Sequence, residues 1–528
     1  MTTRNVAIND DENSAGEGIV GEFTHACSRS LCENFANSLA SEVMVQNGHP
    51  VSSSDITYSS LSSIPRDILA NCSNRSQAIR ESLLSGSKVV FVCSGFPTKR
   101  FIYEIARDRG ISAAIIDNPD SWADSLQREG VIDHFVPIDM SRSPEEVLES
   151  AVRAIEGLSP VWVPDGICTF VELAVELTSR LGKAFGLPHS AIPSIEAVRD
   201  KSKTRSALKD VEARKISTKD DLREALKHIG FPGVIKPVSG AASLCVQRFD
   251  SLEEAFAIFD RVREEMVSSL IVSSGALGRK SQSANSLEPE TSLSAHSVIT
   301  TDLMVEEYLD GPEVDVDIIM SDGECQYANV IDNGPTFEPF FAETWAAVPS
   351  LVHSAARVAE LTTLAIKCLK TLELTDGIFH VELKFTSRGP RLIEINARMG
   401  GGPTRTIHQL VAGVDLVLEQ LLIAVGIPSR PPVSPTPLVR IGYAFINART
   451  SGYVESVEFM EQYKDRPFVV HLITYIKPFE ICCGPKDGLP TWLGEIVVAH
   501  QDGPTALALV QAIEQEIADD FSARCIPV

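Results

Sequence analysis

The chain has 528 residues, of which 44% are hydrophobic and 22% are charged, and this is the composition of an ordinary globular protein. Its length exceeds what one hydrophobic core supports, so we expect roughly three or four structural units. The formal net charge of −24 argues against nucleic acid or an anionic membrane as a partner, because both bind basic surfaces.

The cysteine pattern favours a reducing compartment. The chain has 11 cysteines, an odd number, and they are scattered without a C-x-x-C spacing. This pattern predicts neither a disulfide framework nor a zinc site, and we expect a cytoplasmic location. The sequence also lacks an N-terminal apolar run typical of a signal peptide and an apolar segment long enough to span a membrane.

The N-terminal third predicts an extension followed by a parallel sheet. Residues 1–85 are rich in Ser and Asn, and we expect a loosely ordered extension with one helix near Leu31–Gln46. Residues 86–194 alternate apolar strands with helices, which predicts a doubly wound, Rossmann-like domain. Its strands are expected at Lys88–Cys93, Ile111–Ile116, Phe135–Ile138 and Val161–Val163. Because the turn at Ser94 and Gly95 does not match a dinucleotide fingerprint, we interpret this unit as a substrate scaffold.

Three further units complete a chain of mixed α/β and α+β class. Residues 195–310 combine helices with a strand, a loop of small residues and a second strand, and a low-complexity insertion follows near 273–300. Residues 311–427 contain an acidic hairpin. After a Pro-rich stretch, residues 428–528 predict a small α+β domain.

The acidic hairpin at residues 380–398 is the most informative stretch of the chain. Its alternation of apolar and polar residues predicts two strands, with Ile393 on the opposite face from Leu392 and Glu394. If the connecting loop has three or five residues, Glu382 lies directly opposite Glu394. Facing carboxylates repel each other across a ladder, so we expect a cation between them.

The hairpin also predicts what that cation is. Two carboxylates and the amide oxygen of Asn396 make a hard-oxygen site suited to Mg²⁺, which completes its coordination with water and phosphate. The alternative is an edge hairpin whose acids are simply solvated. If the second strand continues, Arg398 shares the face of Glu394 and Asn396, where its guanidinium could bridge a carboxylate and a phosphate.

A second motif predicts phosphate binding. Lys236 ends an apolar strand and precedes a loop of small residues that includes Ser239, Gly240 and Ser243. Small residues let backbone N–H groups close on phosphate oxygens, while the ammonium supplies a point charge. Lys201, upstream in a cationic cluster, could reach the same phosphates. The alternative for both lysines is a solvated side chain.

A third motif predicts nucleoside recognition. A strand end runs into an acidic stretch that offers backbone N–H and C=O groups to an adenine edge, with carboxylates for the exocyclic amine or the ribose hydroxyls. This stretch comprises Glu306, Glu307, Tyr308 and Leu309. Glu313, Asp315 and Asp317 then alternate along the next strand and are expected to share a face.

In their order and rough spacing these motifs resemble the ATP-grasp fold. The sequence Glu-Ile-Asn-Ala-Arg-Met-Gly-Gly at 394–401 is most similar to L-amino acid ligases and carnosine synthases. The resemblance covers about 86–528. It implies a pre-ATP-grasp domain at 86–194, a lid subdomain at 195–310, a catalytic subdomain at 311–427 and a C-terminal domain at 428–528. A homodimer through the first of these is also implied.

The resemblance implies roles for the motif residues. The two lysines would hold the phosphates of ATP, and residues 306–309 with Glu313 would hold adenosine. The implied ligands of Mg²⁺, or of Mn²⁺ as a substitute, are Glu382, Glu394 and Asn396. Arg398 would face the acyl phosphate or the substrate carboxylate and would stabilise an oxyanion together with backbone donors at Gly400 and Gly401.

A substrate loop is the last element that the resemblance implies. Glu343 would meet the amino group of one substrate. Family members carry a His three residues later, whereas this chain has Ala346, and this departure affects the expected substrate. Trp345 would form a wall of an apolar pocket or pack in the core. Arg405 and His408 would touch the second substrate, unless they serve the helix surface.

The implied activity is that of an ADP-forming ligase acting on a small-molecule carboxylate and an amine. It would join two amino acids, or an amino acid and an amine, through an acyl phosphate. Two alternatives stay open at this point. One is a carboxylase of the biotin or purine-pathway type, which would share the ATP site. The other is an ATP-binding regulator without turnover.

Overall fold

The computed structural model describes residues 44–46, 49–51, 56–158, 161–240, 245–268, 271–273, 276–277, 292–294, 302–338 and 340–528. Most of the N-terminal helix predicted near residues 31–46 lies outside these residues. Its last three residues, Met44–Gln46, form strand β1 instead, which pairs with β2 (His49–Val51). The short strands β10 (Ile271–Ser273), β11 (Ala276–Leu277) and β12 (Ser292–Ser294) form a small sheet of their own.

The predicted parallel sheet is present, in the order β5-β4-β3-β6. Its strands are β3 (Lys88–Val92), β4 (Ser112–Asp117), β5 (His134–Pro137) and β6 (Gly166–Cys168). The strand predicted at Val161–Val163 is wrong, because the fourth strand begins at Gly166. Pro164 has no N–H group to donate to a ladder, which explains why pairing starts after it. Val161 and Val163 are exposed.

Helices cover both faces of this parallel sheet, as a doubly wound fold requires. The helices in this part of the chain are α5 (Arg100–Asp108), α6 (Asp124–Arg128), α7 (Pro144–Glu156) and α8 (Val175–Phe185). The segment before the sheet contributes η4 (Tyr58–Ser63), α3 (Arg66–Leu69) and α4 (Asn74–Leu83). Ile79 and Leu83 of α4 are buried in one core with Phe91 of β3, so packing continues across the predicted division at residue 85.

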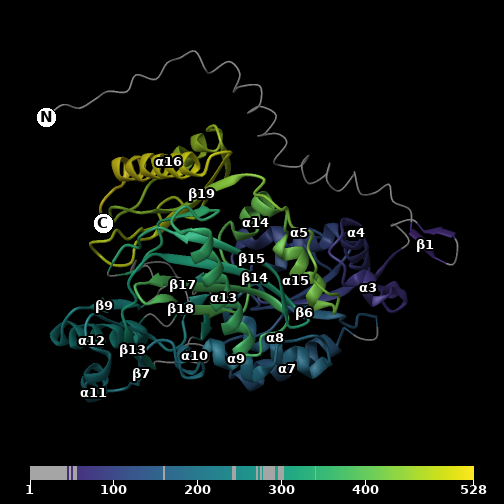
Figure 1. Ribbon diagram of the computed structural model, residues 1–528, viewed down its shortest axis with the longest axis horizontal. Coiled ribbons are helices and arrows are strands. Elements are labelled where there is room, and N and C mark those ends of the chain that lie inside the picture. Colours follow the sequence, from purple (N-terminus) through teal and green to yellow (C-terminus); the bar gives the residue numbers. More distant parts are fainter. Residues whose placement is uncertain are drawn as a thin grey trace, which may run out of the picture.

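A second, antiparallel sheet has the order β7-β13-β8-β9 and lies at the lower left of Figure 1. Its strands are β7 (Ala213–Ile216), β8 (Gly233–Pro237), β9 (Gln247–Phe249) and β13 (Leu303–Glu307). Helices α11 (Lys219–Ile229) and α12 (Leu252–Ser268) pack on this sheet through Leu222, Phe249 and Phe259. Two helices join it to the preceding domain, α9 (Ile192–Arg199) and α10 (Lys201–Leu208).

The central sheet has eight strands in the order β18-β17-β14-β15-β16-β19-β21-β20 (Figure 1). They are β14 (Glu313–Ser321), β15 (Glu324–Asn333), β16 (Trp345–Val348), β17 (Gly377–Thr386), β18 (Gly389–Asn396), β19 (Arg440–Asn447), β20 (Val469–Thr474) and β21 (Trp492–His500). Because β16 pairs with β19, strands from both sides of the predicted division at residue 428 belong to one sheet. The C-terminal residues thus extend the central sheet.

Packing on the central sheet decides which face carries the polar residues. Helix α13 (Ala355–Thr371) packs on the face where Val314 and Val316 of β14 are fully buried. The alternating residues Asp315 and Asp317 therefore share the opposite face, as predicted. Helices α14 (Thr404–Ala412) and α15 (Leu416–Ala424) contact β19 and β14 respectively, and α16 (Gly503–Arg524) packs on β19 and β21.

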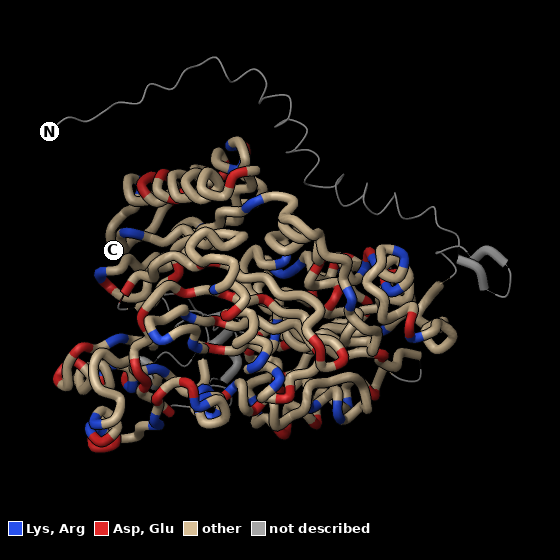
Figure 2. Tube along the Cα trace, viewed as in Figure 1, with Lys and Arg blue, Asp and Glu red and all other residues tan. Residues whose placement is uncertain are grey.

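Charged residues of both signs are mixed along the described part of the chain. Figure 2 shows Lys and Arg positions scattered among Asp and Glu positions instead of gathered along one element. No single helix in the described part of the chain has the length and hydropathy needed to cross a membrane. Helices α14 and α15 meet these requirements only as a pair that bends by 104°.

A buried polar cluster connects α4 to α15 and the chain that follows it. Gln77 donates to Glu419 Oε1 at 2.9 Å, and Ser429 donates to Glu419 Oε2 at 2.5 Å. Arg80 is fully buried and donates to the carbonyls of Leu69 and Asn71. Burial raises the pKa of Glu419 from 4.5 to about 7, although Ser429 and Arg80 favour its ionised form.

This cluster predicts a pH-dependent loss of stability. Because the folded-state pKa of Glu419 lies above its unfolded-state value, its contribution to stability is complete below about pH 4.5 and is lost as the pH rises through about 7. The loss is on the order of 3 kcal/mol at most. Denaturant unfolding at pH 5 and pH 8 should show a smaller loss in Glu419→Gln than in the wild type. An equal loss in both proteins would contradict the assignment to Glu419.

Candidate active site

The acidic hairpin forms, but with a different turn from the one predicted. Strands β17 and β18 are joined by two residues, Ser387 and Arg388, instead of three or five. A bulge then shifts the register, so that Leu383 pairs with Leu392 while Glu382 pairs with Glu394. The facing of the two carboxylates is therefore confirmed, although the loop lengths expected to produce it are wrong.

The bulge also corrects the expected faces of β18. Ile393 is the extra residue between the paired positions 392 and 394. A bulge places two residues opposite one, so residues before it change face. Leu392 and Ile395 are therefore both buried in the core beside α13, so the prediction that Leu392 shares the face of Glu394 is wrong. The carbonyl of Ile393 accepts a hydrogen bond from Arg205 at 2.8 Å.

The three predicted metal ligands lie together at the end of this hairpin. Asn396 donates to Glu382 Oε1 at 3.0 Å, and the ammonium of Lys201 lies 2.7 Å from Glu394 Oε1. Burial raises the pKa of Glu382, and the neighbouring charge of Glu394 raises it further. Lys201 compensates for one of the two facing carboxylates, and a second positive charge is needed to offset the other.

This donor set fits a small divalent cation. Two carboxylates and an amide oxygen are hard ligands of the kind that Mg²⁺ prefers, with positions left for water and phosphate. In the described ranges, no group of three or more His, Cys, Asp or Glu side chains is arranged to hold a metal. A metal at Glu382 and Glu394 would thus depend on the amide of Asn396 and on ligands brought by a phosphate.

The second predicted lysine is held in a buried ion-pair network. Lys236 of β8 donates to Glu306 Oε1 at 2.5 Å, and Arg205 of α10 donates to Glu306 Oε2 at 2.9 Å. Burial opposes the ionisation of Glu306, but the charges of Arg205 and Lys236 outweigh it and lower its pKa to about 2. Glu306 therefore positions the two cations, and both oxygens of its carboxylate already bind protein side chains, Lys236 and Arg205. Removing it would leave two buried charges unpaired, which is strongly destabilising.

The neighbours of Glu306 form a polar rim. Glu307 pairs with Arg388 of the hairpin turn at 2.5 Å. Tyr308 donates to Glu338 at 2.8 Å, and the guanidinium of Arg248 lies 4.4 Å from the centre of its ring. These contacts join the β13 end to the central sheet. Contact of these residues with adenosine stays a prediction.

Other predicted nucleotide contacts are distributed around this rim. Leu309 is buried, and Glu313 lies 3.7 Å from Lys384, with a pKa that burial raises to about 7. In the loop of small residues, Ser239 donates to the carbonyl of Arg199 at 2.9 Å, and Gly240 is half-buried. Ser243 lies outside the described residues.

Arg398 adjoins the metal ligands, as the sequence predicts. Its guanidinium donates to Asn396 Oδ1 at 3.3 Å and to the carbonyl of Met399 at 2.9 Å. Its Nε lies 3.0 Å from Glu172 Oε2, and Glu172 Oε1 accepts from Arg199 at 2.8 Å. Burial opposes the ionisation of Glu172, but the two guanidinium groups outweigh it and lower its pKa.

Glu172 is a site residue that the sequence analysis missed. It follows β6 closely, at the carboxyl edge of the parallel sheet, where ligands bind in open α/β sheets. That rule could have pointed to Glu172 from the sequence. The sequence analysis interpreted this domain as a substrate scaffold but named no binding residue in it, because Glu172 and Arg398 pair although they lie far apart in the sequence.

The glycine run after Arg398 passes very close to its neighbours. A Cβ at Gly400 would lie 2.7 Å from Thr404 Oγ1 and 2.9 Å from His380 Nδ1. Gly402 has a φ of +55°, and a Cβ there would lie 2.8 Å from Glu495 Oε2. Around Gly401 nothing lies within 4 Å of a Cβ position. A side chain at Gly400 or Gly402 would therefore force a neighbouring side chain to move, whereas Gly401 adjoins open space.

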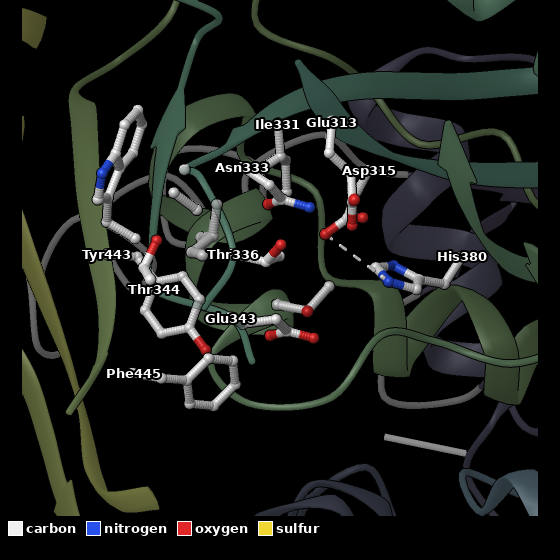
Figure 3. Close-up of a pocket in the computed structure, with 15 residues that line it drawn as sticks. Glu313, Asp315, Ile331, Asn333, Thr336, Glu343, Thr344, His380, Tyr443 and Phe445 are labelled. Carbon is white, nitrogen blue, oxygen red and sulfur yellow. Dashed lines mark ion pairs between the residues drawn. The ribbon is translucent and has the colours of Figure 1, made fainter. Parts of the chain in front are cut away.

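Figure 3 shows an acidic cavity on the polar face of the central sheet. Its lining includes Glu313, Asp315, Glu343, Trp345, Ala346, His380, Tyr443 and Phe445. Glu343 lies open to the cavity. Partial removal of its carboxyl group from water raises its pKa to about 8, and the charges of Asp315 and Glu313 contribute to this rise. The predicted substrate-loop residues Glu343 and Trp345 therefore reach one cavity, together with the acids of β14.

His380 balances part of this negative charge. Its Nδ1 lies 2.9 Å from Asp317 Oδ1, and its Nε2 lies 3.8 Å from Asp315 Oδ2. Burial lowers the pKa of His380, but the two carboxylates outweigh it and raise the pKa to about 10. At neutral pH the imidazole is therefore a cation that fixes the acids of β14, and it is not available as a base.

The two residues predicted to touch the second substrate have protein partners. His408 is fully buried, with Nε2 2.7 Å from Asp317 Oδ2 and Nδ1 2.7 Å from the hydroxyl of Tyr327. Its predicted substrate contact is wrong, because this face of α14 packs on the sheet. Arg405 forms two hydrogen bonds with Asp415, at 2.8 and 2.6 Å. A substrate role for Arg405 stays a prediction.

Three comparisons with known proteins agree with this geometry. The family model described as "ATP-grasp domain" matches residues 229–407. The chain has an ATP-grasp fold. A crystal structure of an L-amino acid ligase from Bacillus licheniformis superposes with a TM-score of 0.65 at 21% identity, covering 82% of this chain and 98% of that chain. The predicted ATP-grasp fold with a parallel sheet and antiparallel sheets is confirmed.

The ATP-grasp chain is also similar in sequence to two kinds of ligase. Carnosine synthase 1 of Gallus gallus is 30% identical over 389 residues, and alanine–anticapsin ligase of Bacillus subtilis is 29% identical over 330 residues. These alignments cover 71% and 60% of this chain. The chain spans 38% of the length of the first relative and 64% of the second. The predicted resemblance to ligases of these kinds is confirmed.

The facing carboxylates predict a response to Mg²⁺ that does not depend on turnover. Thermal unfolding of the wild type should shift upward by about 1–3 °C in millimolar Mg²⁺, because the ion binds the folded state. In Glu382→Gln the metal-free protein should melt at a higher temperature, since one repelling charge is gone, and the Mg²⁺ shift should disappear. Glu324→Gln is the control, because Glu324 forms an exposed pair with Lys370. An unchanged Mg²⁺ shift in Glu382→Gln would place the ion elsewhere.

Proposed function

We propose that this protein is an ATP-dependent, ADP-forming ligase that joins a small carboxylic acid to an amine. The substrates we infer are two amino acids, or an amino acid and another amine. One observation carries the proposal. Lys201 meets Glu394 at the hairpin end where Glu382, Asn396 and Arg398 also meet, so phosphate-binding, metal-binding and acyl-binding chemistry share one site.

Each group has a defined task in this reaction. Lys201 and Lys236 bind the phosphates of ATP, while Glu382, Glu394 and Asn396 hold Mg²⁺, or Mn²⁺ in its place. When bound, the metal neutralises charge on the transferring phosphoryl group. Residues 306–309 and Glu313 face adenosine. The pairing of Lys236 with Glu306 keeps the ammonium in place before ATP arrives, which reduces the cost of ordering it.

The chemistry proceeds in two steps on the substrates. An oxygen of the acid attacks the γ-phosphate, which releases ADP and gives an acyl phosphate. The amine then attacks the acyl carbon, the C–O bond to phosphate breaks, and inorganic phosphate leaves with the amide formed. Phosphorylation is needed because a free carboxylate has a poor leaving group. Arg398 and the backbone N–H groups near Gly400 and Gly401 stabilise the tetrahedral oxyanion.

The acidic cavity supports an amine as the second substrate. Glu343 has no positively charged partner within 4 Å among the described residues, and Asp315 adds to the negative potential. An ammonium entering the cavity supplies the missing positive charge and favours the ionised form of Glu343. Because the pKa of Glu343 is raised to about 8, it lies closer to that of an amine, and the carboxylate can accept a proton from the ammonium before attack. The cytoplasmic location and the homodimer stay predictions from the sequence.

A substrate panel tests the proposal. The purified full chain is incubated with ATP, Mg²⁺ and single or paired amino acids and amines, and ADP and phosphate are measured together with the coupled product by mass spectrometry. We expect at least one acid and amine pair to release stoichiometric phosphate and give an amide. ATP turnover that depends on bicarbonate would favour a carboxylase instead. ATP binding without ADP release under every pair would favour a regulator.

One substitution tests the metal assignment within this reaction. Glu394→Ala should reduce phosphate release by about 1,000-fold or more, because both the metal and Lys201 lose their shared partner. The far-UV circular dichroism spectrum should be unchanged. Glu324→Ala, a surface substitution at a residue paired with Lys370, should keep full activity. An active Glu394→Ala protein would refute the role of the facing carboxylates.

A further inference from the structure

The loop after β3, residues 94–99, is held rigidly at the carboxyl edge of the parallel sheet. Ser94 donates to Asp117 from its hydroxyl at 2.5 Å and from its backbone N–H at 2.9 Å. Tyr103 donates to the carbonyl of Ser94 at 2.9 Å, and Trp122 donates to the carbonyl of Gly95 at 2.7 Å. A loop with this many side-chain hydrogen bonds can hold a ligand-binding side chain in a fixed position.

The loop positions Lys99. Gly95 has a φ of +69°, and a Cβ there would lie 2.9 Å from Lys99 Cδ and 3.1 Å from Val171 Cγ2. The stem of Lys99 therefore packs over Gly95, and its ammonium donates to the carbonyl of Phe170 at the end of β6. Phe170 is two residues before Glu172, so Lys99 reaches the same edge that contacts Arg398.

The amine of Lys99 has no charged partner. Within the described ranges, no carboxylate lies within ion-pair distance of its ammonium, and its hydrogen-bond partner is a neutral carbonyl. Glu172 is the carboxylate whose charge acts on Lys99, but it already pairs with Arg199 and Arg398. Burial, followed by repulsion from Arg398, lowers the pKa of Lys99 to about 7. Two guanidinium groups thus share one carboxylate beside the amine of Lys99, in a protein whose net charge is −24.

We propose that Lys99 binds the carboxylate of the acid substrate and thereby selects the acid that is phosphorylated. This inference rests on the proposed ligase function. An incoming carboxylate supplies the counter-ion that Lys99 lacks, and charge-assisted hydrogen bonds of this kind are strong. The phosphates of ATP are assigned to Lys201 and Lys236 of α10 and β8, whereas Lys99 comes from the parallel-sheet domain, so we assign it to the acid.

Steady-state kinetics of Lys99→Met test this assignment. The methionine keeps the stem that packs on Gly95 and removes the charge. We expect KM for the acid to rise about 10- to 100-fold, with KM for ATP changed by less than about 2-fold. Lys99→Arg, which keeps the charge, should recover part of the affinity for the acid. A rise in KM for ATP alone would assign Lys99 to a phosphate and overturn the proposal, as would unchanged kinetics.

Lys88→Met is the matched control. Lys88 also donates to a backbone carbonyl, that of Val161 at 3.1 Å, but it begins β3 and so lies at the opposite edge of the sheet. Its substitution should leave both KM values unchanged. An effect equal to that of Lys99→Met would mean that loss of any lysine from this domain disturbs the site.

A binding measurement separates this inference from the ligase proposal. Reductive methylation of the full chain with formaldehyde and a borohydride reagent, which releases no carboxylate, followed by mass spectrometry, compares Lys99 with Lys88. Acetate or the acid found active in the panel should slow labelling of Lys99 by at least about 3-fold and leave Lys88 unchanged, and ADP alone should not protect Lys99. Protection without any turnover would refute the ligase function but keep the carboxylate site. Equal labelling with and without carboxylate would refute the site.

Discussion

The repulsion between Glu382 and Glu394 is the constraint around which the other site residues are arranged. Two carboxylates face each other at the end of a hairpin, and a bulge at Ile393 maintains this facing despite a two-residue turn. Lys201 offsets one charge and Asn396 binds the other carboxylate. The arrangement costs stability unless a further cation is present. It is therefore best explained by a function in which a metal ion binds between the two carboxylates.

The sequence correctly predicted those features of the structure that depend on the local alternation of apolar and polar residues. Alternation located the strands of the hairpin and of the parallel sheet, and the order of the motifs predicted the ATP-grasp fold. The turn length was wrong because a hairpin with a two-residue loop and a bulge gives the same facing as a longer loop. Leu392 was placed on the wrong face for the same reason. The burial of His408 could not be predicted, since it depends on which face of α14 packs against Asp317 and Tyr327.

Contacts between distant strands add what the sequence did not indicate. The contact of Glu306 with adenosine stays a prediction, but β13 pairs with β8 so that Val234 lies opposite Glu306 and Lys236 lies opposite Met304. Residues two apart on paired strands share a face, and Lys236 and Glu306 are therefore diagonal neighbours. Their ion pair, with Arg205 added, makes Glu306 a residue that positions cations. Nothing in the local sequence near position 306 indicates which strand it pairs with.

Three packed units contribute cations to one edge of the site, although the chain as a whole is strongly acidic. Lys99 comes from the parallel-sheet domain, Lys236 from the second sheet and Arg398 from the chain after β18. The acids Glu172 and Glu306 hold Arg398 and Lys236 at fixed positions before any ligand binds, and the carbonyl of Phe170 holds Lys99. An anionic substrate therefore meets charges that need little reorganisation, whereas elsewhere the negative net charge disfavours its binding. Under the proposed function, the local excess of positive charge, and not the overall composition, would determine where an anionic substrate is held.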